Sequence, residues 1–204
     1  MSVPVHEAPP ALREIQHQLE NAGPAALALS ARGRKVLGYT CPLMPEELAH
    51  ALGLHPMRLT LSLDGAPGQG SIASSEGCCT WERSLLSQAA AGRFGHLWGL
   101  VFSCNTCPSV RNLAQRWQEA VKQPSQEKTH ELRLPLPRDG QGSWETHEHE
   151  FLRLKWWMEQ RLGRTLEAGA LERSTLLFNR IRAALRGLQA AGQAGRLPAN
   201  IVVT

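Results

Sequence analysis

The sequence lacks any long hydrophobic run. No stretch of about 18 apolar residues, the length that a membrane-spanning helix requires, occurs in the 204-residue chain. Residues 1–16 contain no cationic segment followed by an apolar one, so no secretory signal peptide is predicted. We therefore expect a cytoplasmic protein without a membrane partner, in a compartment where thiols stay reduced.

Charge of one sign is also not concentrated anywhere. The formal net charge is +4, and the basic residues are scattered, with the tightest upstream cluster at residues 32–35. No basic run is interleaved with aromatic residues, so nucleic acid is not predicted as a partner. A mildly basic surface suits an anionic small molecule instead.

Two common catalytic signatures are missing. The glycines of residues 65–70 are not followed by the Gly-Lys-Ser/Thr of a phosphate-binding loop. No Ser/His/Asp arrangement and no internal repeat can be identified. The chain is 42% hydrophobic, which is enough for one core with an appendage.

Alternating apolar and helix-forming segments predict an α/β fold. We expect an open parallel sheet of about four strands with flanking helices, followed by a C-terminal pair of α-helices, since strands that alternate with helices of this length form parallel sheets. The expected strands are residues 35–40, 56–61, 97–102 and 132–136, and the helices between them are residues 45–53, 79–91 and 109–121.

Three regions are expected along the chain: an N-terminal helical segment (1–34), a cysteine-bearing α/β domain (35–140) and a helical extension (141–198). In the extension, apolar residues at helical spacing predict helices over 151–162 and 177–188, which we expect to pack on each other or on the N-terminal helix. After Pro198, residues 200–204 resemble the start of another strand.

All five cysteines follow expected strands. Cys41 follows the first strand, Cys78 and Cys79 follow the second strand and its loop, and Cys104 and Cys107 follow the third. The carboxyl ends of parallel strands share one edge, so these thiols are predicted to converge there. Cys79 and Cys107 also precede expected helices, whose positive ends favour a thiolate.

The spacing alone leaves the role of these thiols open. Thiolates bind zinc or iron–sulfur clusters. Cys104 and Cys107 have the spacing of a zinc knuckle, but Cys78-Cys79 is not a second such pair and no histidine pair lies nearby. A third interpretation is that some cysteines are small buried hydrophobic residues.

Four segments carry a family resemblance. Residues 38–59, GYTCPLMPEELAHALGLHPMRL, match the pattern P-x-E-L-x-x-A-x-G-x-x-P-x-R-L. The segment CTWERSLLSQAAAG matches a cysteine-led helix at Cys79 and Arg83. The segment GLVFSCNTCPSVRNLAQRW matches C-D-x-x-R-x-L at its second cysteine, except that Pro108 replaces the aspartate. Asn179 and Arg182 match N-x-x-R.

These segments cover most of residues 35–190, in order, and resemble the 2-hydroxyacyl-CoA dehydratase family, which includes benzoyl-CoA reductase subunits and double-cubane cluster proteins. The family has two α/β domains with a cluster between them, and the second domain is expected to be absent here. The resemblance implies Cys79 and Cys107 as cluster ligands, with Cys41 as a weaker candidate and Glu47 as an active-site acid. Cys78 and Cys104 are neighbours that could substitute for these ligands or be ordinary buried residues.

The resemblance also implies the chemistry. We expect an iron–sulfur cluster, [4Fe-4S] or double-cubane, that takes part in radical dehydration or reduction of an acyl-CoA thioester. The implied partners are a second dehydratase subunit or the missing domain, and an ATP-driven activator protein. The chain alone is expected to lack turnover. The alternatives are a double-cubane-type reductase of small molecules, a non-catalytic or truncated redox subunit, and a small zinc-binding domain.

Overall fold

A computed structural model describes residues 10, 13, 14, 17, 22–60, 79–103, 108–121, 129–134 and 144–195 of the chain. Cys78, Cys104 and Cys107 lie outside these residues, and so does the strand expected at 200–204. No helix in the described ranges combines the length and the apolar composition needed to cross a membrane.

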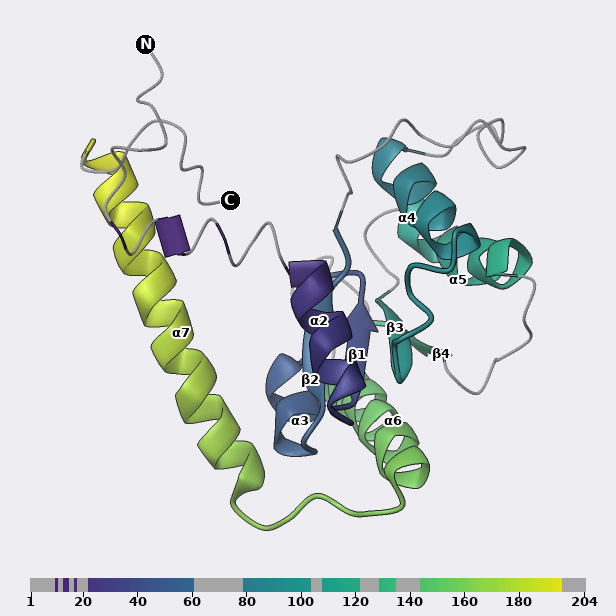
Figure 1. The fold of residues 1–204 in the computed structure, drawn as a ribbon. Coiled ribbons are helices and arrows are strands. Elements are labelled where there is room, and N and C mark those ends of the chain that lie inside the picture. Colours follow the sequence, from purple (N-terminus) through teal and green to yellow (C-terminus); the bar gives the residue numbers. More distant parts are fainter. Residues whose placement is uncertain are drawn as a thin grey trace.

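The described part of the chain forms the predicted four-stranded parallel sheet, with strand order β2-β1-β3-β4 (Figure 1). The α/β fold class is therefore confirmed. The strands are β1 (Val36–Tyr39), β2 (His55–Arg58), β3 (Gly99–Ser103) and β4 (Thr129–Leu132). The helices are α2 (Ala22–Ala31), α3 (Glu46–Ala51), α4 (Thr80–Ala90), α5 (Pro108–Val121), α6 (Trp144–Leu162) and α7 (Ala170–Gln193).

Helices cover both faces of the sheet because the central strands are apolar on both sides. Side chains alternate along a strand, and in β3 Leu100 and Phe102 join one core while Val101 joins the other. The first core lies under α2, α4 and α5, and the second lies under α3 and α6. Every residue of β1 and β3 is buried, as expected for the inner strands of a parallel sheet.

Gly38 lets the first core close over β1. A Cβ atom at this position would lie 2.8 Å from Leu97 Cδ1 and 3.1 Å from Leu100 Cδ1. A side chain at this position would therefore require the leucine side chains to shift, because they occupy the space beside Gly38.

Helices α6 and α7 are longer than the helices expected at 151–162 and 177–188, and the fourth strand is shifted. The fourth strand is Thr129–Leu132 rather than residues 132–136, because Leu132 is already the last residue paired with β3, opposite Ser103. The expected segment also contains Pro135, which has no N–H for a strand ladder. At the N-terminus, Gly23 and Pro24 lie in the first turn of α2, where proline is well tolerated.

The two C-terminal helices were expected to pack on each other or on the N-terminal helix, and among the described residues their main contacts lie elsewhere. Helix α6 packs on β4 and α3, where it buries Leu154 and Met158, and α7 packs on α3. Figure 1 shows α7 as a long helix on the outside of the molecule. Leu176, Ile181 and Leu185 of α7 are exposed.

The packing of α6 predicts different effects for two leucines on the same helix. Leu154 is fully buried, whereas Leu152 is 55% exposed. Leu154→Ala is expected to lower the free energy of unfolding by about 2–5 kcal/mol, because it leaves a cavity under the sheet. The control Leu152→Ala should change it by about 0.5 kcal/mol or less. Urea denaturation measures both, and equal losses would contradict this packing.

A second prediction concerns His130 of β4, which stacks on Trp157 of α6 with ring centroids 5.1 Å apart. Burial, followed by the charge of Arg153, lowers the pKa of His130 from 6.5 to about 4. The neutral ring therefore stabilises the fold fully above pH 6.5, and this contribution is lost as the pH falls to about 4.

The unfolding free energy should accordingly decrease over that pH range, and His130→Phe should make the decrease smaller. His149→Phe, on the exposed side of α6, is the control and should leave the slope unchanged. Urea denaturation at a series of pH values measures the slope. An identical slope in the wild type and His130→Phe would show that another group is responsible.

Candidate functional site

The carboxyl ends of β1 and β3 meet at one edge of the sheet, as the sequence predicted. The Ser103 backbone N–H donates a hydrogen bond to Thr40 Oγ1 at 3.1 Å, and both residues are buried. Cys41 follows Thr40 directly and is half-buried. Ser103 directly precedes residue 104 in the chain.

Cys79 is the N-cap of α4. Its thiol is exposed, and its Sγ accepts a hydrogen bond from the Glu82 backbone N–H at 3.5 Å. The first amides of a helix have no partner within the helix, and a side chain at the N-cap satisfies one of them. The predicted helix start at Cys79 is therefore confirmed, with a sulfur atom in the place where Ser, Thr or Asp is more usual.

The helix expected after Cys107 is also present, since α5 begins at Pro108. Helices α4 and α5 pack along each other (Figure 1). The closeness of Cys79 and Cys107 falls outside the described residues and stays a prediction. Among the residues that the structure describes, no three His, Cys, Asp or Glu side chains are grouped so that they could hold a metal ion.

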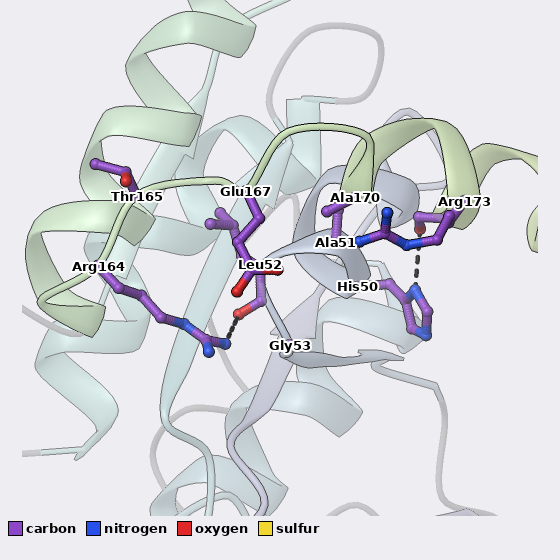
Figure 2. Close-up of a pocket in the computed structure, with 10 residues that line it drawn as sticks. His50, Ala51, Leu52, Gly53, Arg164, Thr165, Glu167, Ala170 and Arg173 are labelled. Carbon is purple, nitrogen blue, oxygen red and sulfur yellow. Dashed lines mark hydrogen bonds between the residues drawn. The ribbon is translucent and has the colours of Figure 1, made fainter.

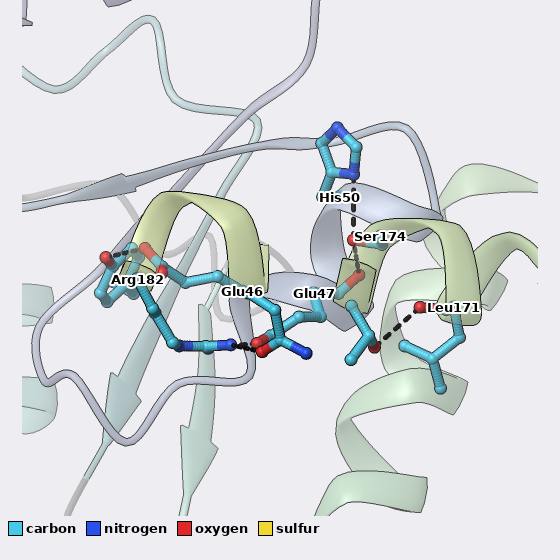
Figure 3. Close-up of polar contacts among 9 residues, drawn as sticks. Glu46, Glu47, His50, Leu171, Ser174 and Arg182 are labelled. Carbon is cyan, nitrogen blue, oxygen red and sulfur yellow. Dashed lines mark hydrogen bonds and ion pairs between the residues drawn. The ribbon is translucent and has the colours of Figure 1, made fainter. Parts of the chain in front are cut away.

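Glu47 lies in the first turn of α3, and its carboxylate forms an ion pair with Arg182 of α7 (Figure 3). Arg182 also donates to Asn179 Oδ1 at 3.2 Å. The structure thus brings the glutamate of the first matching segment to the two residues of the last. The contact joins residues 135 positions apart in the sequence.

A buried serine of α7 makes a second contact with α3, and we call this contact region the α3–α7 junction. The Ser174 hydroxyl donates to the Glu47 backbone carbonyl at 2.8 Å, and its oxygen lies 3.0 Å from His50 Nδ1. The His50 ring packs edge-on against Phe178, with centroids 5.7 Å apart. Sequence reasoning missed Ser174 and His50, because a contact across more than a hundred residues leaves no local spacing to recognise.

Tyr39 ties α3 to the sheet at the same place. Its hydroxyl donates a hydrogen bond to the Glu46 carboxylate. Burial, followed by the hydrogen bond and the charge of Glu46, raises the pKa of Tyr39 far above its ordinary value of 10.0. Tyr39 therefore stays a hydrogen-bond donor. The first turn of α3 is thus held by Tyr39 through Glu46 and by Arg182 through Glu47.

A pocket of about 280 Å³ lies at the other end of α3 (Figure 2). There the Arg164 guanidinium donates to the Leu52 carbonyl, which belongs to the last turn of α3. This arginine thus caps the C-terminal end of α3 and also lines the pocket. The pocket lies next to the start of β2, away from the cysteine edge, and none of the predicted site residues lines it.

The thiols of the described residues have the chemistry of cluster ligands. Cys79 is exposed at a helix N-terminus, where the amide dipoles favour negative charge, and Cys41 is accessible beside the ends of β1 and β3. Soft thiolates can bind zinc or an iron–sulfur cluster. The carboxylate of Glu47 lies in the helix that follows Cys41, so an acid and a thiol belong to one connected segment.

The α3–α7 junction yields a stability prediction. Ser174→Ala is expected to lower the free energy of unfolding by about 1–3 kcal/mol, because it removes the buried hydroxyl that links Glu47 and His50. The neighbouring Thr175→Ala removes only a hydrogen bond to Leu171 within α7 and should cost about 0.5 kcal/mol or less. Thermal or urea unfolding measures both. Equal costs would show that the junction does not depend on this contact.

Comparison with known families identifies the family to which the chain belongs. The family described as 2-hydroxyglutaryl-CoA dehydratase, D-component, matches residues 41–202. No curated protein matches the chain at a significant level. The matched range begins at Cys41 and includes Glu47, Cys79, Cys107 and Arg182. Because the match spans most of the sequence, the chain belongs to the 2-hydroxyglutaryl-CoA dehydratase D-component family.

Proposed function

We propose that this dehydratase-type component binds an iron–sulfur cluster at the carboxyl edge of its sheet and takes part in radical dehydration of 2-hydroxyacyl-CoA thioesters. The observation that carries the proposal is the exposed Cys79 thiol at the N-terminus of α4. The thiol is accessible to a metal, and the helix start favours its anionic form.

The cluster ligands would be Cys79 and Cys107, with Cys41 as an additional ligand. In the sequence, Cys79 directly precedes α4 and Cys107 directly precedes α5. A [4Fe-4S] cluster bound by these thiols would supply one-electron reduction. The protein would contribute the thiolates, and the N-terminus of α4 would stabilise the negative charge of the cluster.

Glu47 is the proposed acid of the site. Arg182 holds its carboxylate at the first turn of α3, on the segment that leads from Cys41. An anchored carboxylate of this kind can orient a substrate hydroxyl group, because the ion pair and the Ser174 contact restrict the motion of α3. The electron is proposed to come from a separate ATP-driven activator protein.

The partner component is proposed to cover the outer part of α7. The family is described as one component of a dehydratase. Helix α7 extends past α3 and exposes Leu177 by 37%, Ile181 by 44% and Leu185 by 49%, which lie on one stripe of the helix because they are four residues apart. Apolar side chains along one helix are costly to leave in water and are typical of an interface. We therefore assign this surface to the second dehydratase subunit or domain.

Anaerobic reconstitution of the full chain with iron and sulfide tests the cluster. The wild type should turn brown, with broad absorption near about 400 nm. Cys79→Ser and Cys107→Ser should each lose most of the bound iron, and Cys41→Ser should lose less. Cys78→Ser, which removes the adjacent thiol, is the matched control and should keep the cluster.

Iron and sulfide analysis together with the visible spectrum gives the result. Equal iron in Cys79→Ser and the wild type would contradict the proposed ligand. A colourless wild-type chain that retains zinc would contradict the iron–sulfur assignment, because thiolate-bound Zn²⁺ is d¹⁰ and redox-silent.

A further inference from the structure

A fully buried carboxylate lies one helical turn after Cys79. Glu82 of α4 is 0% exposed, and its Oε1 accepts a hydrogen bond from Arg116 Nη1 of α5 at 2.9 Å. Three residues of α-helix rise about 4.5 Å, so Glu82 lies about one turn along α4 from Cys79. Around the ion pair, α4 and α5 meet through apolar side chains that include Leu85, Leu86, Leu113 and Trp117.

The burial of this ion pair between α4 and α5 carries a large desolvation penalty. Within the described part of the chain, Glu82 Oε2 is buried without a hydrogen-bond partner. Removing a carboxylate from water carries a large penalty that a single ion pair seldom repays in stability. A leucine would fill the same space without that cost, so stability does not account for this residue.

The relative position of α4 and α5 does account for the presence of Glu82. Apolar helix contacts tolerate small sliding movements, whereas a charge-assisted hydrogen bond sets one relative position of the two helices. A glutamate three residues after an N-cap commonly reaches back to the N-cap amide. Here the Glu82 side chain reaches across to Arg116, while its backbone N–H donates to Cys79 Sγ. One residue thus connects the thiol to the neighbouring helix.

We propose that Glu82, through Arg116, is a positioning residue that holds the start of α4 in register with α5 and so places the Cys79 thiol. Its use in cluster binding rests on the proposed function, because the second thiol precedes α5. The positioning itself is a property of the protein without a metal. It can therefore be measured whether or not a cluster binds.

The test measures the rate at which iodoacetamide alkylates Cys79 in the metal-free full chain, followed by peptide mass spectrometry. Glu82→Gln removes the charge and keeps the size, and it is expected to raise the rate by about three- to tenfold as the coupling between the helices is lost. Glu119→Gln is the control. It changes an exposed carboxylate on α5, the helix that carries Arg116, and should leave the rate unchanged. Iron per chain after reconstitution should fall in Glu82→Gln only.

A double variant keeps the test decisive if Glu82→Gln does not fold. Glu82→Met with Arg116→Met replaces both charges by apolar groups, which usually preserves stability but removes the fixed register. A raised Cys79 rate in this folded variant supports the inference. A wild-type rate in the folded variants, with only the urea midpoint changed, would overturn it. A wild type that binds no iron would refute the proposed function, while a raised Cys79 rate in Glu82→Gln would still support the positioning role.

Discussion

The burial of β1 and β3 on both faces is the constraint on which the rest of the structure depends. Both strands are apolar on each side, so helices must cover the two faces, and the helical crossovers between the parallel strands supply that cover. Parallel strands then end at the same edge. This edge is where Cys41 follows β1 and where the hydrogen bond between Thr40 and Ser103 joins the two strand ends. Cys41 is therefore accessible at this edge because the parallel strands, covered by helices on both faces, end there.

Helix α3 shows how a site residue can depend on a distant part of the chain. With only six residues, Glu46–Ala51 is too short to be stable in water by itself. Tyr39 holds its first turn from the sheet, and Ser174 and Arg182 hold it from α7. The carboxylate of Glu47 therefore has a defined place because α7 packs on α3.

The buried carboxylates of the molecule fall into two kinds. Burial by itself would raise the pKa of Glu159, but hydrogen bonds from Lys155 and the Leu166 N–H bring it below the ordinary value. That carboxylate is satisfied and ties α6 to the loop that follows. Glu82 has one oxygen paired and one without a partner among the described residues. Glu159 is therefore explained as a structural anchor. The desolvation penalty of burying Glu82 requires another explanation.

The sequence by itself determined the α/β class, the order of strands and helices, the helix starts at Cys79 and Pro108, and the family resemblance. These features depend on local patterns of apolar, cysteine and proline residues, which are visible along the chain. Tertiary structure alone decided the pairing of Glu47 with Arg182, the buried contact of Ser174, the ion pair between Glu82 and Arg116, and the packing of α7 on α3. It also moved the fourth strand to Thr129–Leu132, since pairing with β3 outweighs local preference. The physical reason is that such contacts join residues far apart in the sequence, and their energy exists only after the core has brought them together.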